Sequence, residues 1–179
     1  MNVKIRNAQR TDAPIIAWTT LTVLDMDYAD LDRFIGICSE DDSLYSWKNS
    51  RIAEVNGMAV GCIISYKGED YWDMRVRTWP RFWNNFDPEY LKTVDVEARP
   101  DEFYIDSVAV IPEFRGYGIG VALLEDSVRR GRKSDCKNVT LLVEKSKIRL
   151  KTFYEKVGFI EFGEMEFFGH DYFRMKYNR

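Results

Sequence analysis

The stretch that decides the fold of this chain of 179 residues is Ile105-Asp106-Ser107-Val108-Ala109-Val110-Ile111-Pro112-Glu113-Phe114-Arg115-Gly116-Tyr117-Gly118-Ile119-Gly120. The apolar run from Phe103 to Ile111 predicts a strand, and the run from Ile119 to Lys133 predicts a helix. The glycines between them allow positive φ and a close approach of the backbone to a ligand. A helix N-terminus adds unpaired N–H groups and a partial positive charge. The stretch therefore predicts a cradle for an anion, which we interpret as a pyrophosphate.

The spacing of these glycines excludes two common phosphate-binding loops. A dinucleotide fingerprint requires Gly-x-Gly-x-x-Gly, but Val121 occupies the place of the third glycine. A P-loop ends in Gly-Lys-Ser/Thr, which is missing here. The remaining pattern, Arg-x-x-Gly-x-Gly after Ile111-Pro112-Glu113, resembles the cofactor motif of the GNAT superfamily of acetyl-CoA-dependent N-acetyltransferases.

Composition narrows the class of protein. Hydrophobic residues make up 45% of the chain and charged residues 31%, which is typical of a soluble globular protein with a real core. There is no apolar run of 18 residues and no signal-peptide core near Met1, so we expect no membrane partner. The three cysteines favour reduced thiols and a cytoplasmic location.

Charge and histidine content exclude two further classes of site. The net charge of −3 argues against a nucleic-acid-binding surface. One histidine and no Cys-x-x-Cys predict that no metal is bound.

The N-terminal part predicts a strand, a helix and a hairpin. Residues 2–8 predict the strand, and Thr11-Asp12 offers an N-cap, with Pro14 near the start of a helix that runs to about Leu24. The acidic residues 25–42 predict a loop and a short helix. Asn56-Gly57 predicts the turn of a hairpin over residues 51–66.

The rest of the chain divides into an irregular part and a regular part. Residues 68–100 are rich in aromatics, Trp83 among them, and predict only a short helix at Asp87-Pro88. The elements expected after them are a strand at 102–111, a helix at 119–133, a strand at 138–144, a helix at about 147–156, and closing strands at Phe159–Phe168 and Tyr172–Tyr177.

This order predicts a mixed α/β or α+β fold. The resemblance, strongest over residues 100–162, implies a GNAT-like central, mostly antiparallel, twisted sheet flanked by helices. We expect a single N-acetyltransferase domain over residues 1–179, with residues 68–100 as a variable insertion.

The resemblance also implies how the cofactor, acetyl-CoA, is held. The main chain of Val108 and Val110 would pair with the pantetheine arm, although both side chains are equally consistent with plain sheet core. The amides of Arg115, Gly116, Tyr117, Gly118, Ile119 and Gly120 would hold the pyrophosphate. Arg115 itself either contacts phosphate or braces the loop.

A second signature lies in Phe153-Tyr154-Glu155-Lys156-Val157-Gly158-Phe159, which resembles the Tyr-x-x-x-Gly-Phe of the family. It implies that Tyr154 is the general acid that protonates the thiolate, the alternative being a core aromatic. Lys147 and Leu150 stand where members often have Asn and Ala. These departures leave open the alternative that the protein is a catalytically silent module that binds CoA and acts as a sensor or interaction partner.

The resemblance implies direct transfer of the acetyl group to a primary amine of a small molecule or peptide. Asp106 is the leading candidate for the base, with Glu102 and Glu144 as rivals. The acidic stretch 25–42 either attracts a cationic amine or is a solvated loop. The aromatic segment 71–90 forms a lid, an apolar wall or a subunit interface, and a homodimer is possible.

Overall fold

The computed structural model describes residues 1–82 and 86–178, so Trp83 lies outside the described residues. The chain forms two compact units. Unit one comprises residues 1–65 and 106–127, and unit two comprises residues 66–105 and 128–178. The boundaries between the units fall inside two strands and one helix.

The strands belong to one seven-stranded sheet of order β1-β2-β3-β4-β5-β7-β6. Their bounds are Val3–Asn7, Ser50–Val55, Met58–Lys67, Glu102–Val110, Asn138–Glu144, His170–Tyr177 and Phe159–Phe167, in that order. The β4–β5 pair is parallel, whereas β1–β2, β2–β3, β5–β7 and β6–β7 are antiparallel. The predicted mixed fold with a mostly antiparallel sheet is confirmed.

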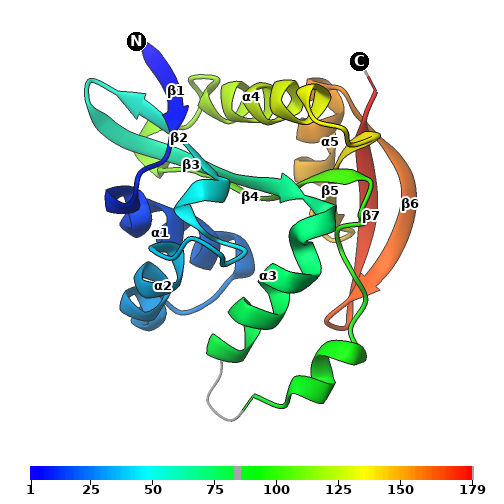
Figure 1. The fold of residues 1–179 in the computed structure, drawn as a ribbon. Coiled ribbons are helices and arrows are strands. Elements are labelled where there is room, and N and C mark those ends of the chain that lie inside the picture. The colour runs from blue at the N-terminus through cyan, green and yellow to red at the C-terminus, as the bar shows by residue number, and fades with distance from the viewer. Residues whose placement is uncertain (83–85, 179) are drawn as a thin grey trace. The chain divides into compact units, whose positions relative to one another are not determined.

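Unit one contains the predicted hairpin and two helices. Asn56 and Gly57 both have positive φ, 50° and 81°, as a two-residue turn between twisted strands requires. Helices α1 (Ala13–Leu24) and α2 (Leu31–Cys38) pack against each other and are drawn in blue in Figure 1. Their buried side chains, Ile16, Leu21, Phe34 and Ile37 among them, form the core beside the hairpin residues Ile52 and Ile63.

Asp12 lies at the N-cap position of α1, as predicted, but its carboxylate does not cap the helix. It accepts hydrogen bonds from Arg6 on β1 at 2.7 and 2.9 Å and from the amide of Gln9 at 2.7 Å. Asp12 therefore ties the first strand to the entrance of the first helix.

Unit two contains the long β6–β7 hairpin, orange and red in Figure 1, together with helix α5 (Ile148–Val157). Helix α5 ends at Gly158, whose φ of 118° only glycine adopts readily. Helix α4 (Ile119–Lys133) has the predicted bounds, and its C-terminal part belongs to this unit.

The prediction that residues 68–100 have little regular structure is wrong for residues Tyr71–Thr78, which form helix α3. Arg75 explains the order, because its side chain is fully buried and bonds carbonyl oxygens of Leu91, Val94 and Asp95 at 2.9–3.1 Å. Its guanidinium also lies 4.0 Å from the centre of the Trp79 ring. These are tertiary contacts that no local periodicity encodes. The short helix expected at Asp87-Pro88 is present as a 3₁₀ helix, Pro88–Lys92.

Candidate functional site

The glycine-rich loop lies in unit one, between the end of β4 and the start of α4. A 3₁₀ turn at Pro112–Phe114 follows the strand, and the amide of Ile111 bonds the carbonyl of Val60 at 2.9 Å. Gly116 and Gly118 have φ values of 82° and 79°, a region that costs side-chain-bearing residues energy. Helix α4 then begins at Ile119. The loop thus has the conformation that its glycines predict.

Five consecutive backbone amides of this loop, those of residues 116–120, donate to no other residue in the described part of the chain. Two of them come from the first turn of α4, where a helix leaves its N–H groups unpaired. The prediction also included the amide of Arg115, but this N–H donates to the carbonyl of Pro112 at 3.2 Å. Unlike the amides of residues 116–120, the amide of Arg115 therefore has a partner within the loop.

The side chain of Arg115 braces the loop. Its Nε donates to the carbonyl oxygen of Val110 at 2.9 Å, which connects the end of β4 to the residue that precedes Gly116. Tyr117, two residues further along the loop, is 66% exposed. Of the two roles considered for Arg115, bracing is the one with an observed contact.

Val108 and Val110 are partly exposed residues in the second half of β4. The ladder between β4 and β5 pairs residues 102–105 with residues 138–141 and includes neither valine. Gly61 on β3 lies against this half of β4. A Cβ at Gly61 would meet the carbonyl oxygen of Ala109 at 3.0 Å and Leu123 Cδ1 at 3.3 Å. The sequence gives no local signal for this close approach.

The three candidate bases differ sharply in their surroundings. Asp106 is partly exposed and accepts a hydrogen bond of 2.7 Å from the Ser107 hydroxyl. Glu102 is buried in an ion pair with Arg174 at 2.8 Å, and it also accepts from Thr140 and from the amide of Arg99. A carboxylate satisfied in this way is structural, so Glu102 is a poor candidate for the base.

Glu144 ends β5 in unit two. The Ser146 hydroxyl hydrogen-bonds its carboxylate and holds the pKa of Glu144 below its usual value, and Lys147 acts in the same direction. A lowered pKa makes a weaker proton acceptor, which leaves Asp106 as the strongest of the three candidates.

Tyr154 lies on α5, in unit two. It is 6% exposed and packs against Phe153 and Phe159, with ring centroids 5.6 and 6.0 Å away. Burial raises the pKa of its phenol, so the hydroxyl keeps its proton at neutral pH. Lys147 is the N-cap residue of α5 and Leu150 is 36% exposed, so neither departure from the family pattern disturbs the packing of Tyr154.

Two of the seven acidic residues in the stretch 25–42 form ion pairs with nearby cations. Asp41 contacts Lys48 at 2.8 Å and Arg10 at 3.1 Å, and Asp30 pairs with Arg33. Asp27 accepts from the amide of Ala29 instead. These contacts favour the solvated-loop interpretation over an attractive surface for a cationic amine.

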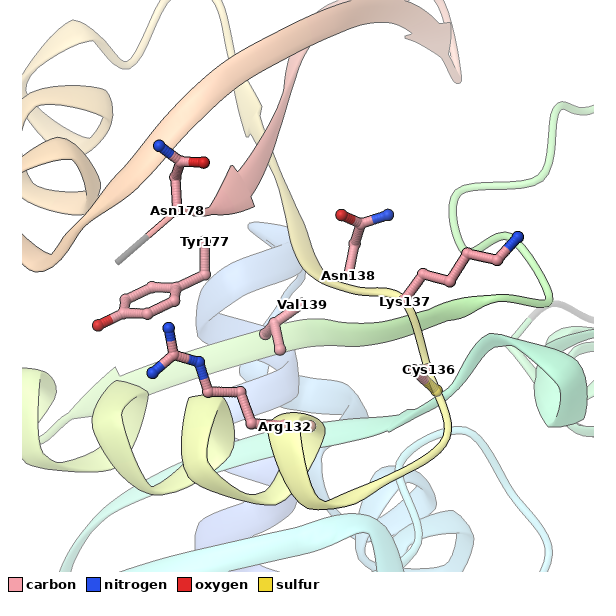
Figure 2. A pocket seen from close by; sticks show the side chains of 8 residues that line it. Arg132, Cys136, Lys137, Asn138, Val139, Tyr177 and Asn178 are labelled. Atoms are coloured by element: carbon pink, nitrogen blue, oxygen red, sulfur yellow. The ribbon is translucent and has the colours of Figure 1, made fainter.

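A separate cavity of about 310 Å³ lies in unit two, where the end of α4, the start of β5 and the end of β7 meet (Figure 2). Its lining includes Arg132, whose guanidinium lies 4.9 Å from the centre of the Tyr177 ring. Lys137 points away from these two side chains in Figure 2 and pairs with Asp101 at 3.3 Å. None of the predicted site residues lines this cavity.

Two general features of the described residues bear on the class of protein. Among residues 1–82 and 86–178, no three His, Cys, Asp or Glu side chains are grouped so that they could hold a metal ion. No helix within the same ranges has the length and apolar character needed to cross a bilayer.

Comparison with known proteins places this geometry in a family. The family model described as the acetyltransferase (GNAT) family matches residues 15–159. Among curated proteins, none matches the sequence significantly.

Solved structures show the same fold. An N-acetyltransferase from Staphylococcus aureus Mu50 has a TM-score of 0.79 and 24% identity, and the match covers 97% of this chain and 99% of that one. A structure described as an acetyltransferase has a TM-score of 0.76 and 22% identity, with coverage of 97% and 98%. A spermidine N-acetyltransferase chimera from Vibrio cholerae and hSSAT has a TM-score of 0.63 and 17% identity, with coverage of 99% and 95%.

The match to the family model covers most of the chain, including the glycine-rich loop and Tyr154. The chain therefore belongs to the acetyltransferase (GNAT) family, as an acyltransferase of the N-acetyltransferase type that uses acetyl-CoA.

Proposed function

We propose that this protein transfers the acetyl group of acetyl-CoA directly to a primary amine of a small molecule or peptide. The observation that carries the proposal is the run of five amides, residues 116–120, that have no partner in the described chain. These N–H groups are free to donate to a ligand, and a pyrophosphate supplies several acceptors together with negative charge.

The loop and β4 hold the cofactor in this proposal. The five amides bind the pyrophosphate, while the main chain of Val108 and Val110 pairs with the pantetheine arm as an added strand would. Arg115 keeps the loop in shape through its bond to the Val110 carbonyl. Because the backbone makes these contacts, the proposal assigns no role to the two valine side chains, which are partly exposed.

Asp106 and Tyr154 carry out the proton transfers. A lysine-like amine is only roughly 0.04% neutral at pH 7, so a proton acceptor increases the reactive fraction. Asp106 takes this proton, and the neutral amine attacks the thioester carbonyl. When the carbon–sulfur bond breaks, the thiolate receives the proton of the Tyr154 hydroxyl. No cysteine–histidine pair is used, so no acetyl-enzyme forms.

Four further expectations belong to the same proposal: a cytoplasmic location, a partner that is neither nucleic acid nor membrane, a possible homodimer, and a single catalytic domain over residues 1–179. They rest on composition and on the family resemblance. Sedimentation of the purified protein would measure its oligomeric state.

Thermal melting with acetyl-CoA tests the proposal, with NAD and ATP as controls. A ligand present at 100 times its Kd adds about 2.7 kcal/mol of stability, which is a clear shift in Tm. A shift with acetyl-CoA alone, followed by acetylation of amines, is the expected result. A shift without turnover on a broad amine panel would favour the silent CoA-binding module. No shift from protein free of copurified CoA would contradict the proposed cofactor site.

A further inference from the structure

The cavity of about 310 Å³ shown in Figure 2 has no role in the proposed function. Its volume lies at the lower end of the range for pockets that hold small molecules, about 300–1,000 Å³. Every described residue that lines it belongs to unit two, and none of these residues is acidic. The cavity thus has room for a small ligand and offers no carboxylate that would bind a cation.

Arg132 supplies the positive charge of this cavity. Its guanidinium and the Tyr177 ring face each other in Figure 2, and the 4.9 Å cation–π contact between them holds the planar group in place. Within residues 1–82 and 86–178, the Arg132 side chain forms no hydrogen bond and no ion pair. The other cation of the lining, Lys137, pairs with Asp101 at 3.3 Å. The N–H donors of Arg132 are therefore available to a ligand.

The rest of the lining offers uncharged donors and apolar surface. Asn138 begins β5 and Asn178 follows β7, and in the described part of the chain neither side-chain amide has a hydrogen-bond partner. Val139 and the ring of Tyr177 line the same cavity and contribute apolar surface. A ligand that fits must therefore combine a negative charge with an apolar part.

Hydrogen bonds fix the walls of the cavity before any ligand binds. On the side of α4, the Ser134 hydroxyl donates to the carbonyl of Gly131 at 2.6 Å and accepts from the amide of Cys136 at 3.2 Å. On the side of β7, the amide of Asn178 donates to the carbonyl of Gly158 at 3.0 Å. A site that is formed in advance reduces the entropic cost of binding.

The donors of the lining match a carboxylate better than a phosphate. A guanidinium presents a planar fork of N–H groups that fits the two oxygens of one carboxylate. A phosphate dianion carries more charge than Arg132 alone can balance, and the lysine of the lining is already paired with Asp101. A single carboxylate balances the charge of Arg132 and leaves the apolar surface to the remainder of the ligand.

A simpler interpretation is that Arg132 only stabilises the end of α4. Cations in the last turn of a helix suit its partial negative charge. Arg130 and Lys133 lie in the same turn and have the same effect. This interpretation explains a cation near the end of the helix, but it does not explain why one of them lies over a tyrosine ring in a cavity without an acidic partner.

We propose that this cavity binds a small monocarboxylic acid with an apolar body. Arg132 holds the carboxylate, the amides of Asn138 and Asn178 are further donors, and the apolar body contacts Val139 and the ring of Tyr177. The site is separate from the groups assigned to acetyl transfer, none of which lines the cavity. The inference therefore does not depend on the proposed function.

The thiol of Cys136 reports on the cavity, because it belongs to the lining and is partly exposed, whereas Cys38 and Cys62 are buried. Iodoacetate and iodoacetamide have nearly the same shape. Both alkylate the thiolate, forming a carbon–sulfur bond and releasing iodide, but only iodoacetate carries a carboxylate. The ratio of their rate constants at Cys136, divided by the same ratio in denaturant, measures the preference of the folded cavity for a carboxylate. Mass spectrometry of the Cys136 peptide follows both reactions.

Two variants show whether Arg132 causes this preference. In the wild type we expect iodoacetate to be favoured about 5-fold or more, the size of one favourable charge contact in water. Arg132→Gln should reduce the preference to about 1. Arg132 is exposed, so the fold should persist, and thermal melting checks this. Lys133→Gln is the matched control. It removes the same charge from the same turn, outside the lining, and should leave the preference unchanged.

Competition with iodoacetate tests the apolar part of the ligand. Benzoate and acetate share the carboxylate, whereas benzamide shares the ring of benzoate without its charge. We expect benzoate to slow labelling of Cys136 at a concentration about 10-fold lower than acetate, because its ring buries apolar surface. The same factor should separate benzoate from benzamide, since hydrogen bonds to charged groups are the stronger ones. Inorganic phosphate should also compete more weakly than benzoate.

Four results would overturn the inference. The first is a preference of about 1 in the wild type, and the second is a preference that survives Arg132→Gln. The third is equal competition by acetate or benzamide and benzoate, and the fourth is stronger competition by phosphate. None of these measurements involves acetyl-CoA. Failure of the proposed function shows separately, as a missing Tm shift with that cofactor.

Discussion

At the scale of single residues, the phenol of Tyr154 is the group whose removal is most informative. Tyr154→Phe deletes one oxygen from a side chain that packs against Phe153 and Phe159, so the core of unit two should remain intact. We expect kcat to fall by about 10²–10⁴-fold, the usual contribution of a general acid, with little change in the Kd for acetyl-CoA. Steady-state kinetics and a binding titration measure the two quantities. Unchanged kcat would remove Tyr154 from the mechanism.

The charge of Asp12 makes the stability of the fold depend on pH. Burial alone would raise the pKa of its carboxyl, but hydrogen bonds from Arg6 and the Gln9 amide outweigh burial and hold the pKa below its usual value. The unfolded chain therefore binds this proton more readily than the folded chain. The stabilisation is present above the unfolded pKa of about 3.9 and is lost as the pH falls through the lower folded value.

The direction of this pH dependence predicts how the variant Asp12→Asn behaves. At pH 7 we expect it to lose about 1.5–3 kcal/mol of unfolding free energy, since it loses hydrogen bonds to a charged group. Near pH 3 its stability should approach that of the wild type. Urea unfolding at the two pH values measures the difference, and a loss of equal size at both would argue against the role of the charge.

At the scale of elements, the loop between β4 and α4 depends on backbone conformation rather than on space. A Cβ at Gly118 would meet nothing within 4 Å, so Gly118→Ala costs only the strain of its positive φ, about 1–2 kcal/mol. We expect weaker binding of acetyl-CoA, measured by calorimetry. Gly36→Ala on α2 is the matched control. It also meets nothing within 4 Å, its φ is ordinary, and it should leave binding unchanged. Equal effects of the two variants on binding would contradict this account of the loop.

Gly68, just after the end of β3, differs from Gly118 because there is no space for a side chain at this position. A Cβ there would lie 1.8 Å from the carbonyl oxygen of Arg99 and 2.6 Å from its carbonyl carbon, and backbone atoms cannot give way as side chains do. We expect Gly68→Ala to destabilise the fold by about 2–3 kcal/mol, as overpacking does. Urea unfolding measures this loss of unfolding free energy. If Gly68→Ala were no less stable than Gly36→Ala, the backbone around Arg99 would have moved to make room for the added Cβ, which would contradict this prediction.

At the scale of the whole molecule, the three thiols report on folding. Burial raises the pKa of Cys38 to about 12 and raises that of Cys62 further, whereas Cys136 is partly exposed. Since the thiolate is the reactive form, iodoacetamide at neutral pH should label Cys136 in the native protein and all three cysteines in denaturant. Mass spectrometry counts the labels. Native labelling of Cys38 or Cys62 would show that unit one opens readily.

The sequence was a good guide wherever local rules determine structure. Asn56-Gly57 predicted the hairpin, and the pattern from Ile119 to Lys133 predicted the bounds of α4. Both predictions succeeded because turn chemistry and helical periodicity act over a few residues. Helix α3 was missed because a buried Arg75 with three main-chain acceptors organises it. For the same reason the buried ion pair of Glu102 with Arg174, 72 positions apart, could not be foreseen from either residue.

The contact that crowds Gly68 also has a consequence for how the chain can vary in length. Gly68 and Arg99 touch, so the two ends of the segment between them lie side by side. The entropic cost of closing a loop between two such fixed ends grows only with the logarithm of its length. A short turn that joined the end of β3 to the start of β4 would span the same gap. The length of the segment between them can therefore change at little entropic cost, as long as the buried Tyr71 and Arg75 keep their places in the core.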